Sequence, residues 1–482
     1  MMSEPGKPVL RLLAIVSAAT LSACAGLGPS GKPPEAPGVA TPTAWQAPLP
    51  QNGPFASLGD WWQQFKDPAL SQLIAAAQDV SPTVASAGAR IAQSRASLVL
   101  SNAQLGPTLD ASASASRARM DVNAATAYSL SAGLQSQWDL DLFGAGRAAR
   151  DAAQARLAGT APAWHEARIS VAAEVAQQYT SLRACEAQLV QTGLDAQSRK
   201  ETARLTELTA RAGFQAPSNA ALTRASAAQG NAQLLQQQAQ CALGIKALVA
   251  LTGIEEPALR QALQSGTAQL PQPVALALGG VPAQVLAQRP DLAVAARDVI
   301  AAGYDVNASD AQRYPRISLG GSIGVARFSS SALTMNGPTW SIGPLSISFP
   351  VIDGGVRRAN LDAANARLQE ARSVYAAKLR SAVREVEEAL ITLQNTADRT
   401  TDAEVAREGF SASFSAAQAR FRGGLSSLFE LEDARRSAVQ AQSALIELQR
   451  ERVAAWINLY RAVGGGWTQD SALASIPAAA RQ

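Results

Sequence analysis

The chain has 482 residues, of which 47% are hydrophobic and 17% are charged, and its formal net charge is +4. This charge is small for the length and argues against a nucleic-acid-binding protein. A single histidine, His165, and three cysteines leave few of the side chains that metal sites and acid–base catalysis usually employ. The composition therefore disfavours an enzyme, although chemistry carried by carboxylates alone is still compatible with it.

The N-terminus carries the first informative pattern, a secretory signal peptide over residues 1–23. Lys7 and Arg11 precede an apolar run that is shorter than the about 20 residues of a membrane-spanning helix. The Leu-Ser-Ala-Cys sequence that ends at Cys24 resembles a bacterial lipobox, in which the cysteine is lipidated and becomes the mature N-terminus. An ordinary signal peptide that happens to contain this cysteine is the alternative.

Residues 24–58 are predicted to form a lipidated N-terminal linker. Most of this stretch is rich in Pro, Gly and Ala without periodicity, which is typical of an extended linker. By resemblance to bacterial lipoproteins, Ala25 directly after the cysteine favours the outer membrane, where several acyl chains anchor a protein firmly. The covalent lipid on Cys24 is the only non-protein group that we expect.

Two predicted β-hairpins follow, at residues 107–142 and 315–350. Their four segments alternate apolar and polar residues, as the strands of a membrane barrel do. Beyond the N-terminal segment no apolar run is long enough for a transmembrane helix, so a membrane-crossing body would have to be a β-barrel. The alternation slips at Gly343-Pro344, which predicts a bulge or a bend. Two soluble hairpins with one wet face are the alternative.

The remaining sequence predicts long helices. Residues 356–408 and 425–463 contain neither Gly nor Pro, and the first stretch could extend about 80 Å as a helix. This length favours a coiled-coil-like assembly over an ordinary globular helix. Gly423-Gly424 separates this pair, and a similar pair in the first half meets near Gly213–Pro217.

The two halves of the chain share a series of landmarks at a nearly constant spacing. The matched landmarks are Pro107 and Pro315, Gly144 and Gly354, Arg147 and Arg357, Ala155-Arg156-Leu157 and Ala366-Arg367-Leu368, and Ala210-Arg211 and Ala419-Arg420. This spacing predicts an internal two-fold repeat of helix, hairpin and long helix pair. The first repeat covers residues 59–270, the second covers 271–467, and 468–482 form a C-terminal tail.

Four strands are too few to close a barrel, because the smallest known barrels have about 8 strands. An open sheet in lipid would leave unpaired backbone groups, so several copies must share one barrel. Two copies would supply about 8 strands, a size that side chains fill, whereas three would supply about 12 and leave room for a lumen. A solute-conducting barrel therefore requires a trimer or a larger assembly.

An ordered series of short motifs resembles the outer-membrane efflux lipoproteins, the NodT-like branch of the TolC family. Each motif alone is weak, but the series covers roughly residues 60–467 in the family's order. The motifs are Trp61-Trp62, Phe65, Asp67-Pro68, Leu70, Trp138-Asp139-Leu140-Asp141-Leu142-Phe143-Gly144, Arg289-Pro290-Asp291-Leu292, Tyr314-Pro315, Gly343-Pro344-Leu345, Pro350-Val351-Ile352-Asp353-Gly354-Gly355, Glu385-Val386-Glu387 and Gly464-Gly465-Gly466-Trp467.

The resemblance implies a mainly α fold with membrane β structure. A homotrimer would complete a transmembrane β-barrel in the outer membrane, and a long α-helical barrel would extend into the periplasm. Such a protein is the passive conduit of a tripartite efflux system, working with a periplasmic adaptor (membrane fusion) protein and an inner-membrane pump to export small molecules and drugs. A periplasmic coiled-coil lipoprotein, as scaffold or adaptor, and a lipid-anchored carboxylate enzyme are the alternatives; the second lacks a marking motif.

The resemblance also places a gate at the periplasmic tip of the last two long helices. Glu430 and Asp433 match the family's acidic positions, and Phe429 matches an apolar constriction. Carboxylates repeated around a narrow axis repel one another and attract cations, and an apolar ring resists leakage by dewetting. Phe429 and Asp433 share a helix face. A solvated acidic helix start is the alternative.

The helix-tip turns are assigned to Gly213, Ser218, Asn219, Phe421, Gly423 and Gly424. Phe421 stands where the family usually has tyrosine, Glu432 replaces a usual leucine, and Ser218-Asn219 stands where some members have an aspartate, so the closed state would be latched differently.

Cys185 and Cys241 lie at similar distances from the first turn. A periplasmic disulfide is compatible with this spacing, but two small buried core residues are preferred. His165 is assigned to surface or packing. The exported compounds, the adaptor's identity and the energy source of the pump are not specified by the sequence.

Overall fold

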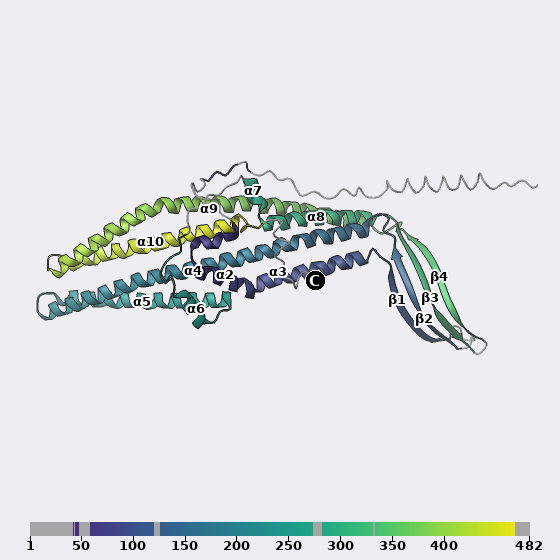
Figure 1. Ribbon diagram of the computed structural model, residues 1–482, viewed down its shortest axis with the longest axis horizontal. Coiled ribbons are helices and arrows are strands. Elements are labelled where there is room, and N and C mark those ends of the chain that lie inside the picture. Colours follow the sequence, from purple (N-terminus) through teal and green to yellow (C-terminus); the bar gives the residue numbers. More distant parts are fainter. Residues whose placement is uncertain are drawn as a thin grey trace, which may run out of the picture. The chain divides into compact units, whose positions relative to one another are not determined.

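The computed structural model describes most of the chain in two compact units (Figure 1). The predictions for the signal peptide, Cys24 and the tail at 468–482 lie outside the described residues, as does most of the linker. The described residues are 42, 44–47, 58–119, 126–272, 282–330 and 333–467.

The strand unit contains the described residues within Arg90–Thr160 and Val294–Ala376. The helical unit contains those within Val39–Ala89, Ala161–Ala293 and Ala377–Gln482. Four helices contribute residues to both units: α3 (Pro82–Ala103), α4 (Ala145–Arg211), α8 (Pro290–Ala311) and α9 (Val356–Arg422).

The strand unit is built on a four-stranded antiparallel sheet in the order β1-β2-β3-β4. The strands fall within the two predicted hairpins, and together with the dominance of helix they confirm the mainly α fold with a small sheet. Their bounds are β1 (Thr108–Ala118), β2 (Ala127–Asp139), β3 (Arg316–Ser329) and β4 (Thr334–Ser348).

The predicted irregularity at Gly343-Pro344 is confirmed as a bulge. The register moves from Leu319 opposite Leu345 to Gly321 opposite Ile342, so β4 contains one residue more than β3 at this point. The Gly343-Pro344 peptide bond is cis.

The sheet has one apolar and one polar face, as the alternation predicted. Leu134, Ile323 and Trp340 lie opposite one another on neighbouring strands, and all three side chains are exposed. On the polar face, hydroxyl pairs bridge neighbouring strands at 2.8 Å, between Ser114 and Ser131 and between Ser322 and Ser341. The described chain by itself therefore leaves a wide apolar surface uncovered.

An aspartate follows each hairpin and caps the N-terminus of the long helix that comes next. Asp141 accepts hydrogen bonds from the backbone N–H groups of Gly146 and Arg147 at 3.0 and 2.8 Å, at the start of α4. Asp353 does the same for Gly355 and Arg357 at 2.9 and 3.2 Å, at the start of α9. Carboxylates are favourable here because the first backbone N–H groups of a helix have no partner within it.

The helical unit contains the C-terminal parts of the long helices α4 and α9, the return helices α5 (Pro217–Thr252) and α10 (Leu428–Ala462) that run back from them, and shorter connecting helices. The predicted long helices are confirmed: α4 and α9 each have 67 residues, and their returns have 36 and 35. The shorter helices are η1 (Leu58–Phe65), α2 (Pro68–Val80), α6 (Glu256–Leu263) and α7 (Pro282–Ala287). No helix in the described ranges combines the length and apolar character needed to cross a bilayer.

The opening motif packs against the end of α10. The Trp61 ring lies 5.6 Å from the ring of Tyr460, and that of Trp62 lies 4.7 Å from it. Asp67 accepts a hydrogen bond from the backbone N–H of Ala69 at 3.0 Å, capping α2, and also accepts one from the Tyr179 hydroxyl. These family motif residues are therefore structural.

A second pair of motifs meets at the start of α8. Arg289 is buried and donates hydrogen bonds to the carbonyl oxygen of Ala462 at 2.8 Å and to Glu385 at 2.9 Å, in addition to its ion pair with Asp291. A Cβ atom on Gly464 would lie 2.3 Å from a backbone carbonyl oxygen, so only glycine fits there.

The structure corrects the preferred prediction that the two cysteines of the first half are unpaired core residues. Cys185 on α4 and Cys241 on α5 form a disulfide with their Cα atoms 5.6 Å apart, so the expectation of two unpaired core cysteines was wrong. The two antiparallel helices return from a tight turn and bring both residues to the same level, a distance that suits a disulfide.

Candidate gate at the helix tips

Two tips of the helical unit hold the predicted turn residues, one joining α4 to α5 and the other joining α9 to α10 (Figure 1). In the first, the N–H of Phe214 donates to the carbonyl of Thr209 at 2.9 Å; in the second, the N–H of Leu425 donates to the carbonyl of Arg420 at 2.8 Å. The residue before each donor is a left-handed glycine, Gly213 or Gly424. This closure is the Schellman arrangement of a helix C-terminus.

Both tips place an apolar side chain directly after this glycine. Phe214 is 84% exposed and Leu425 is 75% exposed. Apolar groups exposed at the end of a hairpin can gain stability by burial against a partner, although single exposed apolar residues are common on protein surfaces. The two tips are thus candidate contact points as well as turns.

The helices that follow the two tips start differently. The side chain of Ser427 accepts a hydrogen bond from the N–H of Glu430 at 3.1 Å and caps α10. Ala216 precedes α5 and has no side chain that can do so. Asn219 donates to Gln215 at 2.9 Å within its own tip, and Ser218 is exposed.

The three predicted gate residues lie in the first turn and a half of α10. Phe429 is 81% exposed, as an apolar constriction requires. Glu430 accepts a hydrogen bond from Arg420 at 2.8 Å, and Asp433 accepts one from Arg436. Each acid therefore has a cationic partner on the surface, which lowers the net negative charge of the tip; such exposed pairs contribute only about 0–1 kcal/mol of stability.

The remaining predicted turn residues lie beside this start. Phe421, in the last turn of α9, is partly buried, and its carbonyl accepts the N–H of Gly424 at 3.0 Å. Gly423 and Gly424 are exposed.

Sequence reasoning missed the most buried cation of the tip. Arg435 on α10 is 1% exposed and donates to the hydroxyl of Thr202 at 2.7 Å and to that of Ser198 at 3.2 Å, both on α4. It also forms an ion pair with Glu432 and lies over the ring of Phe414 at 5.5 Å. Arg435 thus joins the second hairpin to the first.

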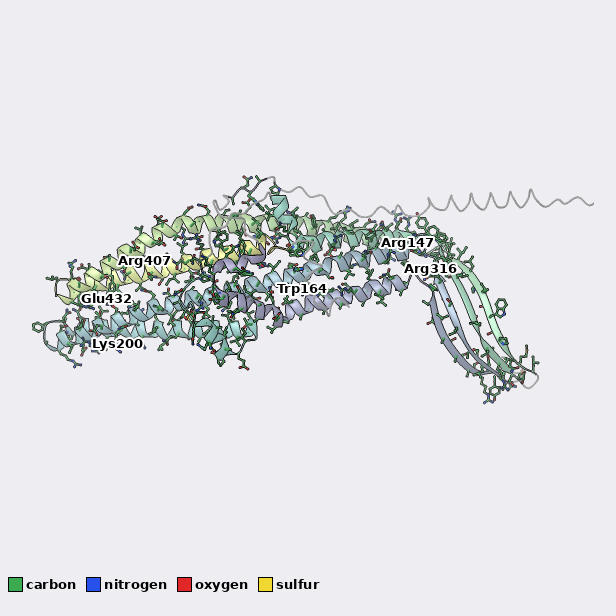
Figure 2. The ribbon with its side chains drawn as sticks, in the orientation of Figure 1. Arg147, Trp164, Lys200, Arg316, Arg407 and Glu432 are labelled. Atoms are coloured by element: carbon green, nitrogen blue, oxygen red, sulfur yellow. A yellow bond between two sulfur atoms is a disulfide. The ribbon has the colours of Figure 1, made fainter. Side chains whose placement is uncertain are left out.

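Glu432, which is labelled in Figure 2, completes this network. Besides Arg435, it reaches the hydroxyl of Ser226 on α5 at 3.4 Å. Asp195, also buried, forms an ion pair with Arg199 at 2.8 Å, and its free oxygen faces the Nε of Arg435 at 4.0 Å. The departure from leucine at 432 is explained by this network, and the i, i+3 spacing to Arg435 was the available sequence signal.

The comparisons with known proteins agree with this architecture. The chain matches the family of outer membrane efflux proteins over residues 73–254 and 281–465. It is 29% identical to the outer membrane protein OprJ of Pseudomonas aeruginosa, over 97% of this chain and 98% of that protein. It is 30% identical to the pyoverdine export outer membrane protein OpmQ of Pseudomonas putida, over 91% of this chain and 94% of that protein.

Among solved structures, the fold resembles the outer-membrane channel OprN with a TM-score of 0.78 and 27% identity, covering 89% of this chain and 99% of that one. The predicted TolC-type, NodT-like resemblance is therefore confirmed. The chain belongs to the outer membrane efflux protein family and is an outer-membrane efflux channel.

Proposed function

We propose that this channel is a passive homotrimeric conduit in a tripartite efflux system and that it is gated at the periplasmic helix tips. The proposal rests on two features of the sheet, its unpaired edges and its exposed apolar face. Among the described residues, β1 and β4 each pair on one side only, and the apolar face is exposed. Lipid tolerates neither open edge, so copies of the chain must complete one barrel, and three copies supply about 12 strands with a lumen.

A duplicated unit, residues 59–270 and 271–467, accounts for the paired features of the chain. The equal lengths of α4 and α9 support it, as do the matched aspartates Asp141 and Asp353 and the identical closure of the two tips. Each repeat then supplies one hairpin to the barrel and one helix pair to the tunnel.

The gate is assigned to Phe429, Glu430 and Asp433. Three-fold symmetry would bring three copies of each around one axis, where the phenyl groups exclude water and the carboxylates select for cations. The pairs of Glu430 with Arg420 and of Asp433 with Arg436 are solvated, so an exchange of partners during opening would cost little free energy.

Lipid on Cys24 would anchor the chain, residues 24–58 would link the anchor to the body, and the helices would extend into the periplasm toward the adaptor and the pump. The name of the relative OpmQ refers to pyoverdine export, which supports a small-molecule cargo. The cargo class is left at small molecules and drugs.

Single-channel recording in planar bilayers tests the proposal. The Phe429→Ala/Asp433→Ala variant should open more often or conduct more current than the wild type, because both the apolar and the acidic ring are removed. Phe410→Ala/Asp402→Ala, which alters exposed residues of α9, is the matched control and should conduct like the wild type.

An inserted gate variant that conducts like the wild type would disprove the gate and leave the channel intact. A protein that gives no current and behaves as a monomer would contradict the conduit and favour a coiled-coil scaffold.

A further inference from the structure

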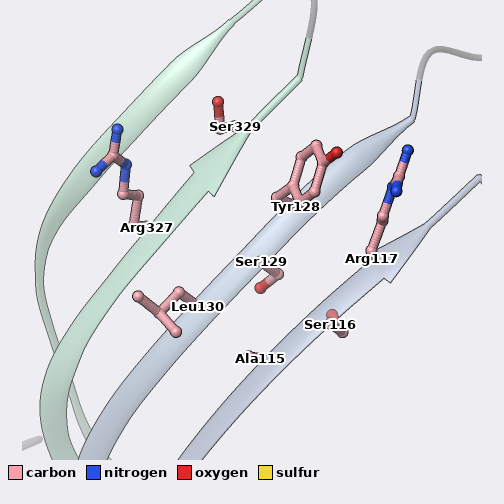
Figure 3. Close-up of a pocket in the computed structure, with 8 residues that line it drawn as sticks. All are labelled: Ala115, Ser116, Arg117, Tyr128, Ser129, Leu130, Arg327 and Ser329. Carbon is pink, nitrogen blue, oxygen red and sulfur yellow. The ribbon is translucent and has the colours of Figure 1, made fainter.

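An open pocket lies at the ends of the strands that are farthest along the chain from the flanking helices (Figure 3). Its volume is about 470 Å³. Arg117 comes from β1, Tyr128 and Leu130 come from β2, and Arg327 and Ser329 come from β3. We call it the arginine pocket.

The strand register places these five residues on one face. Tyr128 lies opposite both Arg117 and Ser329, and Leu130 lies opposite Arg327. Side chains two residues apart on a strand share a face, so this is also the face of Leu134 further along β2. The apolar face of the sheet therefore ends in two guanidinium groups with a tyrosine between them.

Acidic partners are scarce around this pocket. In the described part of the chain, neither Arg117 nor Arg327 has an ion pair, and Arg117 lies over the Tyr128 ring at 5.1 Å. Residues 111–138 and 317–352 contain three arginines and one acidic residue, Asp121, which lies outside the described residues. The strand ends thus have an excess of positive charge where the apolar face stops.

We propose that the arginine pocket binds the phosphate group of a lipid headgroup at the membrane surface; this rests on the proposed position of the sheet in the outer membrane. A guanidinium donates two parallel hydrogen bonds to a phosphate. Two strand spacings across the sheet and an offset of two residues along it place the Cα atoms of the two arginines about 12 Å apart, within reach of one headgroup.

The apolar face of the sheet begins directly beside the pocket. Leu130 and Leu134 continue from the pocket along β2, where acyl chains of the same lipid would lie. Tyrosine is favoured at this boundary because its ring is apolar and its hydroxyl is wet. A free phosphate would use the guanidinium groups but not this face, so we commit to a lipid.

Native mass spectrometry of the full-length protein tests the proposal, with the protein in micelles of dodecyl maltoside, a detergent without phosphate, that contain bisphosphorylated lipid A. A second series uses the same lipid A after its phosphates have been removed. Arg117→Gln/Arg327→Gln should weaken binding of phosphorylated lipid A by at least about tenfold, since charged hydrogen bonds are lost. Arg358→Gln/Arg372→Gln removes the same charge from exposed sites on α9 and should bind like the wild type.

Three results would overturn the lipid site: equal binding by the pocket variant, equal binding of the dephosphorylated lipid, or complete displacement by millimolar inorganic phosphate. The first would mean that the arginines only extend toward water, and the third would indicate a free-anion site. Planar-bilayer conductance of the same preparations separates this inference from the proposed function. A protein that conducts without phosphate-dependent lipid binding disproves the pocket alone, whereas a protein that neither inserts nor conducts disproves the conduit and the lipid site with it.

Discussion

The two helix tips have the same backbone but different chemistry. Counted from Gly213 in one and Gly424 in the other, both following helices begin four residues later, and the fourth residue of each is buried, Ala220 or Leu431. The proposed gate positions Phe429, Glu430 and Asp433 correspond on this count to Ser218, Asn219 and Leu222. At these three positions, acids and an aromatic group therefore occur only in the second tip, whereas the exposed aromatic residue of the first tip, Phe214, corresponds to Leu425.

The contrast extends to how each hairpin is held. The first hairpin has a disulfide between α4 and α5, whereas the second has no cysteine and is joined to the first through Arg435. The shared backbone therefore builds two similar hairpins, and a few side chains decide how each of them is held.

The largest expected change in stability comes from an arginine that is present at the same position in both hairpins. Arg224 and Arg435 occupy equivalent positions, but Arg224 is 71% exposed and pairs with Glu207, whereas Arg435 is buried. Arg435→Met leaves the partly buried Glu432 without its cation and Asp195 with Arg199 alone, and should lower the free energy of unfolding by about 3–5 kcal/mol. Arg224→Met should change it by less than about 1 kcal/mol.

Denaturant unfolding followed by circular dichroism measures both variants. Equal losses would mean that the two tips are held in the same way, and the contrast between them would disappear.

An intermediate effect is expected at the two helix starts. Ser427→Ala removes the cap of α10 and should cost about 1 kcal/mol, whereas Ala216→Ser offers α5 a cap and should add a few tenths to about 1 kcal/mol. Thermal denaturation of the two variants and of the double variant should give shifts of opposite sign that nearly cancel. A destabilising Ala216→Ser variant would show that the first tip cannot accept the geometry of the second.

The smallest effect concerns pH and contrasts α4 with α9. The landmark spacing matches His165 on α4 with Ala376 on α9. Burial and the neighbouring Arg168 lower the pKa of His165 to about 4, whereas burial and then Asp291 raise the pKa of Glu166. Because a lowered histidine pKa disfavours the protonated form in the folded state, stability should fall as the pH drops from about 6.5 to 4.

The raised pKa of Glu166 acts in the opposite direction, because its protonation in the folded state favours folding as the pH falls. His165→Gln should therefore remove a modest loss of stability below pH 6.5, seen as a smaller difference between melting temperatures at neutral and mildly acidic pH. A variant whose pH profile overlays that of the wild type would contradict the assignment.

Local patterns in the sequence determined the elements of this protein. Alternation predicted the four strands and the bulge at Gly343-Pro344, and the absence of Gly and Pro over long stretches predicted α9 and α10. Glycine marked both tips in the sequence, because the chain reverses at Gly213 and Gly424 with a positive φ that glycine adopts without strain. These features depend on neighbours in the chain, which is why they could be read without a fold.

Tertiary structure alone decided which side chains meet. The disulfide between Cys185 and Cys241, the burial of Arg435 and the partner of Glu432 depend on which faces of α4, α5 and α10 pack together, and helices of this length offer several faces at similar cost. Arg117 and Arg327 share a pocket only because the strand order puts β2 between β1 and β3 in one register. Contacts between residues that are far apart in the chain are set by packing, and a periodic pattern carries no information about them.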